Sequence, residues 1–263
     1  MVTTNNQGFT GTRSSLYEEA IVQYPSARIM DVQAMTKHLN PQKNEKVLGI
    51  GEGNGFFALP ILEAIGEKGY YLVIEPSPEQ LANLARRVTS PNLETLTKGI
   101  EDFTPTTYFD KAWSFGAFHH CPNQTQAMKN IYTALTKGGK MVICDVFQGS
   151  NLAKHFDGPV ARYCTSGHEV KFLSDEFAKS LCYLAGFDES KVKIVDLLQK
   201  WKFDSEKDLG DFVYKLHAMT LIPGNEQDKI EEVIKGCKEI LGVKKVGNQY
   251  ELNWPMKALI AEK

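Results

Sequence analysis

Residues 45–147 alternate between short apolar runs and segments with helical periodicity, and this alternation restricts the fold more than any other feature. The apolar runs are KVLGI, GYYLVIE, LETLTKG, FDKAWSFGA and MVICDVF, and helical patterns follow three of them. Strands that alternate with helices are joined by right-handed crossovers, which produce a parallel sheet with helices on both faces. The sequence therefore predicts an α/β fold with a doubly wound, mostly parallel sheet. Two later runs, at 191–198 and 249–263, raise the predicted number of strands to seven.

The helix after the first run is predicted to begin near Gly55, and the helix after the second run has Ser77 as its N-cap. After Phe147 the alternation stops, and 148–170 read as a long irregular segment, a kind of loop that is usually functional. An insertion at 200–247 is expected to form a helical cap near the C-terminus. Three further helices are predicted: one from Ser174 to about Ala185, one from the Ser205 cap, and one from near Asn225.

Composition and charge indicate an ordinary globular protein. Apolar residues make up 42% and charged residues 24% of the chain, and the net charge is −2. We therefore expect no nucleic acid and no membrane as partners, although the net charge leaves room for a local basic patch. The protein is expected to be a monomer or homodimer. The five cysteines form no C-x-x-C pair, so their spacing predicts neither a metal site nor a disulfide framework. The polar N-terminal segment lacks an apolar signal-peptide core, and we expect a cytoplasmic protein.

The first predicted strand ends in a glycine-spaced loop. Gly51, Gly53 and Gly55 make a G-x-G-x-G pattern, whose backbone can approach a ligand closely. A dinucleotide fingerprint needs its third glycine at position 56, where this chain has Phe56, so NAD is disfavoured. Glu75 ends the second predicted strand, where an acid can accept hydrogen bonds from ribose hydroxyls. The alternatives are a tight turn without a ligand and an exposed acid at a strand end.

These motifs, in this order and spacing, resemble those of class I S-adenosylmethionine-dependent methyltransferases. The segments that carry the resemblance are VLGIGEGNG, VIEPSPEQL, KGIEDF, FDKAWSFGAFHH and LTKGGKMVICD. The resemblance covers residues 46–145 closely and the flanking segments more loosely. It implies a Rossmann-like methyltransferase fold, S-adenosyl-L-methionine as the cofactor, and methyl transfer as the reaction. It is nearly silent on the methyl acceptor.

The resemblance also implies roles for individual residues. Glu75 would bind the ribose hydroxyls, Ile100 would cover the adenine ring, and Phe115 would pass near the sulfonium. The loop glycines would lie against the methionine and ribose parts of the cofactor. The full set of implied cofactor positions, apart from Glu52, is Gly51, Gly53, Gly55, Glu75, Pro76, Ile100, Glu101, Phe115 and Gly116.

The glycine loop departs from the family pattern at one important position. The family usually has an acid where this chain has Gly49, and that acid steadies the loop and helps to hold the cofactor's amino group. We hypothesise that Glu52 supplies the missing carboxylate from inside the loop. The alternative is that Glu52 points to solvent and that the backbone alone holds the cofactor.

Candidates for catalysis and acceptor binding come from other segments. His119 and His120 follow the fourth predicted strand, and histidine suits proton transfer near neutral pH. Packing alone is the alternative for each, and His119 is expected to lie closer to the site. The N-terminal segment is a candidate lid, in which Tyr17, Tyr24 and Arg28 would close over the cofactor, with helix packing as the alternative for Tyr24. The candidates for acceptor binding are Tyr17, His155, Arg162, Tyr163 and His168.

The resulting hypothesis is a single methyltransferase domain of residues 1–263, with a helical lid at 1–44, a cofactor-binding core at 45–147, and a substrate-side loop, helical cap and last strands at 148–263. It would methylate an oxygen, nitrogen or carbon nucleophile of a small molecule, mainly by in-line positioning. A second hypothesis is a protein that binds S-adenosylmethionine without methyl transfer. A third is an RNA or protein methyltransferase, which the acidic balance and the lack of an N-P-P-[YF] motif disfavour.

Overall fold

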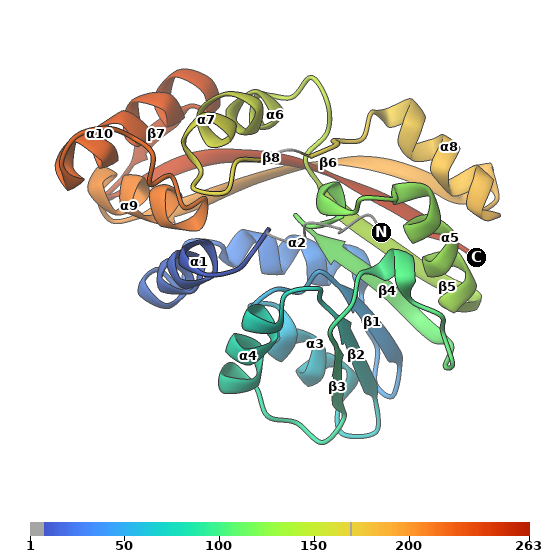
Figure 1. The fold of residues 1–263 in the computed structure, drawn as a ribbon. Helices are drawn as coiled ribbons and strands as arrows, with labels where there is room; N and C mark the ends of the chain where they lie inside the picture. The colour runs from blue at the N-terminus through green and yellow to red at the C-terminus, as the bar shows by residue number, and fades with distance from the viewer. Residues whose placement is uncertain (1–7, 169) are drawn as a thin grey trace, which may run out of the picture. The chain divides into compact units, whose positions relative to one another are not determined.

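The computed structural model describes residues 8–168 and 170–263, and these divide into two compact units. We call residues 32–147, 171–197 and 257–263 the sheet unit. We call the described parts of 1–31, 148–170 and 198–256 the helical unit. Figure 1 shows the helices and strands with the labels used below. Along the described ranges, every helix is too short or too polar to cross a membrane.

The sheet unit is built on strands in the order β3-β2-β1-β4-β5-β8-β6. Strands β1 to β5 pair in parallel, and residues 257–262 of β8 pair antiparallel with β5. The mostly parallel sheet predicted from the sequence is thus confirmed. Strands β6 and β8 each contribute residues to both units. The strand bounds are Lys46–Ile50 (β1), Tyr70–Ile74 (β2), Leu93–Leu96 (β3), Phe109–Phe115 (β4), Leu135–Asp145 (β5), Val192–Phe203 (β6) and Gln249–Glu262 (β8).

The strand order reverses between β1 and β4. The chain moves outward from β1 to β2 and β3, and then places β4 and β5 on the other side of β1. In such sheets a ligand binds beyond the carboxyl ends of the two strands at which the order reverses. The residues that follow Ile50 and Phe115 are therefore best placed to meet a ligand.

Helices of the sheet unit begin where the sequence supplies capping side chains. The side-chain oxygens of Ser77, Asn123 and Ser174 each accept a backbone N–H group and so start α4, α5 and α8. Helix α8 ends at Gly186, whose φ of 113° is readily adopted only by glycine. The helix bounds are Ile29–Leu39 (α2, of which residues from 32 onward belong here), Ala58–Ile65 (α3), Pro78–Arg87 (α4), Gln124–Ala134 (α5) and Asp175–Ala185 (α8).

The helix after β1 begins at Ala58, three residues later than the predicted start near Gly55. Gly51, Gly53 and Gly55 have φ values of 65°, 67° and 80°, which an α-helix does not accept. The backbone therefore turns at each glycine before the helix can start. The glycine loop accordingly spans residues 51–57.

The helical unit contains five α-helices within the described residues and a short antiparallel hairpin. Helices α9 and α10 begin where predicted, with Ser205 and Asn225 as their N-caps. Strand β7 pairs with residues 249–252 of β8. The bounds are Thr12–Gln23 (α1), Asn151–His155 (α6), Ala161–Tyr163 (α7), Glu206–Leu216 (α9), Glu226–Gly236 (α10) and Val243–Val246 (β7).

The stretch after β5 was expected to be irregular, and this expectation is wrong. It contains α6, a π-helical turn and α7 in succession. The Ser150 hydroxyl starts α6 by accepting the N–H of Ala153 (3.0 Å). Leu152, Phe156 and Val160 are buried at a spacing of four residues, which is the helical period. Glycine, proline and charged residues around them obscure this pattern in the sequence.

Aromatic stacking and a buried ion pair hold the helical unit together. The rings of Trp201 and Trp254 stack with centroids 3.7 Å apart. Nε of Arg28 lies 2.7 Å from a carboxylate oxygen of Asp31, and the Trp201 indole also donates to this carboxylate (3.1 Å). The Tyr24 hydroxyl donates a hydrogen bond to a carboxylate oxygen of Asp211 in the same unit (2.8 Å). Tyr24 and Arg28 thus make contacts within the helical unit, and the closure of these residues over the cofactor stays a prediction.

Candidate cofactor site

The glycine loop follows β1 at the point where the strand order reverses. The N–H of Gly51 donates to the carbonyl of Ile74 at the end of β2 (2.8 Å). A Cβ at Gly51 would lie only 2.5 Å from the Cβ of Ala117, which follows β4. The start of the loop is therefore held between the ends of β2 and β4, where only glycine fits.

Gly51→Ala is expected to lower the free energy of unfolding by about 2–5 kcal/mol, from left-handed backbone strain and from overlap with Ala117. Gly138 is the control, because its φ of 80° is also positive and a Cβ there would meet nothing within 4 Å. Gly138→Ala should therefore cost only the backbone strain, about 1–2 kcal/mol. Denaturant unfolding of both variants measures the difference. Equal losses would show that the close approach to Ala117 is unimportant.

Glu75 directly follows β2, and its carboxyl group connects the glycine loop to the start of α4. Oε2 accepts the N–H of Gly53 (3.0 Å), and Oε1 accepts the N–H of Ser77 (2.9 Å). The residue is only 6% exposed, so the alternative of a solvent-facing acid does not hold. Burial raises the pKa of Glu75 to about 7. A carboxylate oxygen has a second lone pair, so each can accept a further hydrogen bond from a ligand.

Glu52 lies within the loop and is also buried, so it does not point to solvent. The Tyr71 hydroxyl in β2 donates to its Oε2, and burial raises the pKa of Glu52 to about 8. A Cβ at Gly49 would lie 2.6 Å from the Tyr71 oxygen and 3.1 Å from Oε2 of Glu52. Glu52 and Tyr71 together therefore occupy the space that a side chain at position 49 would need.

The other predicted cofactor positions lie after the carboxyl ends of neighbouring strands. Pro76 comes two residues after the end of β2. Phe115 is the last residue of β4, and Gly116 directly follows it. Ile100 is buried in the short turn after β3, beside the half-buried Glu101. Burial raises the pKa of the Glu101 carboxyl group. The sheet thus brings all of the predicted cofactor positions to one edge.

Several carboxyl groups gather at this edge of the sheet. Burial raises the pKa of the Cys121 thiol, and three nearby carboxylates raise it further: Glu101, Asp145 and Glu75. With Glu52, four carboxyl groups therefore lie near one another at this edge of the sheet. A cationic ligand helps buried carboxylates to ionise, whereas the phosphates of a dinucleotide would be repelled. The site therefore fits S-adenosylmethionine, which carries sulfonium and ammonium groups.

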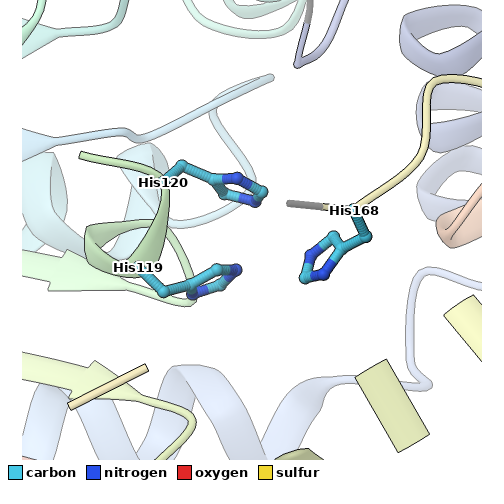
Figure 2. Close-up of side chains that lie close together, drawn as sticks. All are labelled: His119, His120 and His168. Carbon is cyan, nitrogen blue, oxygen red and sulfur yellow. The ribbon is translucent and has the colours of Figure 1, made fainter. Parts of the chain in front are cut away.

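His119 follows β4 and is fixed by Asp145 at the end of β5. Nδ1 of His119 lies 2.6 Å from Oδ1 of Asp145, and the backbone N–H of His119 donates to Oδ2 (2.9 Å). Both residues are buried. The His120 ring lies beside the His119 ring with centroids 4.2 Å apart, as Figure 2 shows. When Nδ1–H donates to a carboxylate, Nε2 is the nitrogen that can accept a proton.

The sequence patterns above do not single out two residues of the site, Asp145 and Tyr71. Asp145 ends β5 directly after the apolar run at 141–144, and an acid at that position was a usable signal. Tyr71 lies inside the apolar strand β2, where its hydroxyl gives no sign of a partner in the glycine loop.

The predicted acceptor-binding residues all belong to the helical unit. His155 is only 1% exposed and packs edge-on against Trp254, with centroids 6.0 Å apart. Neither of its ring nitrogens has a hydrogen-bond partner among the described residues, and burial lowers its pKa to about 4. His155 and Tyr163 line one small cavity.

The remaining three acceptor candidates make separate contacts in the helical unit. The Tyr17 hydroxyl accepts a hydrogen bond from Arg28 (3.2 Å). Arg162 is exposed, and the His168 ring stacks on Phe156 with centroids 4.8 Å apart. Acceptor binding by these residues stays a prediction.

The reversed strand order, the glycine loop and the acid after β2 define a Rossmann-like fold of the class I methyltransferase type. Residues 47–139 match a protein family described as a methyltransferase domain. These residues run from β1 into β5 and include the glycine loop and Glu75. This segment of the chain is thus similar to a methyltransferase domain.

Known relatives share this core over part of their length. The chain is 28% identical over 111 residues to a tRNA U34 carboxymethyltransferase of Shewanella putrefaciens, covering 41% of this chain and 33% of that protein. It is 30% identical over 120 residues to a ubiquinone/menaquinone biosynthesis C-methyltransferase of Sinorhizobium fredii, covering 43% of this chain and 46% of that protein. The chain thus spans about a third of the length of the first curated relatives that it matches.

Solved structures extend the likeness to the whole chain. An N-methyltransferase from Haemonchus contortus, in complex with phosphomonomethylethanolamine and S-adenosylhomocysteine, matches with a TM-score of 0.66 at 16% identity. The match covers 96% of this chain and 57% of that chain. At this level of identity the likeness establishes the fold alone.

Proposed function

We propose that this chain is a methyltransferase that binds S-adenosyl-L-methionine beyond the carboxyl ends of β1, β2 and β4. The observation that carries this proposal is the buried Glu75 carboxyl group, which accepts N–H groups from Gly53 and Ser77. These bonds hold the acid in place beside the glycine loop before any ligand arrives. A fixed acid in this position suits the two adjacent hydroxyl groups of a ribose.

The positions of other residues support roles around the rest of the cofactor. Ile100 provides a buried apolar surface for the adenine ring, with Glu101 beside it. Gly116 has a φ of 64°, which turns the backbone directly after Phe115, where we place the sulfonium end. The cofactor supplies an activated methyl group on a cationic sulfur. The chain mainly aligns the acceptor with that methyl group and excludes water.

His119 is proposed to remove a proton from the acceptor. Asp145 holds its Nδ1, and Nε2 then acts as the base. Nε2 would take the proton that the acceptor atom loses when the methyl group supplied by the cofactor is transferred to it. His120, packed against the His119 ring, is proposed to shape the same end of the site.

A small molecule is the proposed acceptor. The net charge of −2 supports it, because binding to RNA relies on many lysine and arginine contacts to phosphates. RNA is the second candidate, which the names of the tRNA U34 carboxymethyltransferases among the relatives favour. Binding without methyl transfer is the third, which Gly49 in place of the family's acid favours.

Two measurements test these proposals. Calorimetric titration with S-adenosylmethionine should show binding, and absence of binding would refute the proposed function. Incubation with methyl-labelled cofactor and either a metabolite extract or bulk tRNA then tests the acceptor. Label in small products is the expected result. Label in the tRNA would support the second candidate, and binding without any transfer would support the third.

A further inference from the structure

Glu52 is a buried acid whose hydrogen bonds are incomplete. The residue is 5% exposed, and its carboxyl group accepts hydrogen bonds from the Tyr71 hydroxyl, at Oε2, and from the backbone of Phe57. Its Oε1 has no hydrogen-bond partner among residues 8–168 and 170–263. Buried polar atoms are nearly always paired, so an unpaired one within the glycine loop indicates a missing donor. A bound ligand is one source of such a donor.

The glycine at position 49 of β1 leaves the space that the hydrogen-bonded side chains of Tyr71 and Glu52 occupy. A side chain at position 49 would overlap Tyr71, because its Cβ would lie 2.6 Å from the phenol oxygen. Gly49 does not have a positive φ, so its backbone conformation does not require glycine. Glycine at position 49 is therefore explained by the space that the Tyr71–Glu52 pair occupies.

We propose that Glu52, held by Tyr71, receives the ammonium group of the amino-acid part of the cofactor. This inference rests on the proposed function, since it assigns one part of S-adenosylmethionine to one side chain. An ammonium group offers three N–H donors and a positive charge. It would complete the hydrogen bonding of Oε1 and stabilise the ionised carboxylate.

The electrostatics of the site predict that this binding releases a proton. Burial raises the pKa of Glu52 to about 8, the negative charge of Glu75 adds to this, and the Tyr71 and Phe57 hydrogen bonds oppose it. Glu52 is therefore mostly neutral at pH 7 in the free protein. Tyr71 stays protonated, because burial and Glu52 raise its pKa well above 10. An arriving ammonium group would ionise Glu52, and the proton would pass to solvent.

Two ligands distinguish the contribution of Glu52 to binding from that of the other cofactor-binding residues. S-adenosylhomocysteine carries the ammonium group, and 5′-methylthioadenosine keeps the adenosine and the sulfur but lacks the amino-acid part. Glu52→Gln is expected to weaken S-adenosylhomocysteine binding by about tenfold or more, as for a lost hydrogen bond to a charged group. Binding of 5′-methylthioadenosine should change less than about twofold. Glu63→Gln, at an exposed acid on α3, is the matched control and should change neither.

Calorimetric titration in buffers of different ionisation enthalpy measures the number of protons that are released when a ligand binds. At pH 7 the wild-type protein should release more protons with S-adenosylhomocysteine than with 5′-methylthioadenosine, and Glu52→Gln should remove this difference. Tyr71→Phe, which keeps the ring, should weaken S-adenosylhomocysteine selectively as well. Equal effects of Glu52→Gln on both ligands, or no effect on either, would overturn the inference while leaving the proposed function intact. Failure of the wild-type protein to bind both ligands would overturn the proposed function itself.

Discussion

Replacing Glu75 with glutamine is expected to weaken S-adenosylmethionine binding by about 100-fold, because two charge-assisted hydrogen bonds to the ribose are lost. Glutamine also has one acceptor oxygen where glutamate has two. Either Gly53 or Ser77 would then face an amide NH₂ group in place of the carboxylate oxygen that it now meets. Calorimetric titration of the variant measures the loss.

Glu79→Gln is a suitable control for this prediction. Glu79 is an exposed acid in the first turn of α4, four residues beyond Glu75, and its replacement should leave the affinity within about twofold. The same affinity in Glu75→Gln and the wild-type protein would contradict the assignment of the ribose site.

The affinity should also depend on pH in a defined direction. The ionised carboxylate is the better acceptor for the ribose hydroxyls, and the pKa of Glu75 is raised to about 7 by burial. Affinity should therefore fall as the pH drops through 7, because a proton competes with the ligand. Titration with 5′-methylthioadenosine between pH 6 and 8 isolates this effect from Glu52. The dependence should disappear in Glu75→Gln, and a flat wild-type profile would contradict it.

Asp145→Asn is expected to lower kcat by about 100-fold or more for an acceptor that must lose a proton. Asp145 accepts from Nδ1 of His119 and so leaves Nε2 as the base. An asparagine amide can instead donate to Nδ1, which favours the opposite tautomer. Turnover against pH measures the catalytic effect, and ¹⁵N NMR of the imidazole measures the tautomer directly.

If Asp145 only stabilised the fold, Asp145→Asn would also change properties other than kcat. Cofactor affinity in Asp145→Asn should stay close to that of the wild-type protein, since Asp145 is not assigned to the cofactor. Asp110→Asn is the control. Asp110 also accepts a backbone N–H (2.9 Å, from Lys46), but it lies near the start of β4, and His119 follows the other end of that strand. An unchanged kcat together with an altered His119 tautomer would show that His119 does not act as the base.

The sheet and its cofactor edge are largely predictable from the sequence, for local reasons. Strands β1, β2, β4 and β5 each contain a short apolar run, and the glycines and capping residues such as Ser77 act within a few residues of their own positions. Glu75 is recognisable because it follows a strand at a fixed distance from Gly51. The order of the motifs then places these residues at one edge without any knowledge of packing.

The remaining features depend on contacts between residues far apart in the chain. The hydrogen bond from Tyr71 to Glu52 crosses from β2 to the glycine loop, and the one from Asp145 to His119 crosses from β5 to the residues after β4. Neither pair leaves a periodic or compositional trace. The acceptor residues are less predictable still, because His155 and its neighbours were assigned from a segment whose helical turns the sequence does not reveal clearly.

The pairing of residues 257–262 with β5 has a consequence for the order in which the protein folds during synthesis. The sheet unit lacks this strand, and the helical unit lacks much of β8, until the ribosome has added the residues after 249. Neither unit can therefore close early as an independent nucleus. Both must wait for long-range pairings, which makes folding slow and leaves apolar strands exposed on the growing chain. A nascent chain of this kind is expected to depend on chaperones more than one whose units are each continuous in sequence.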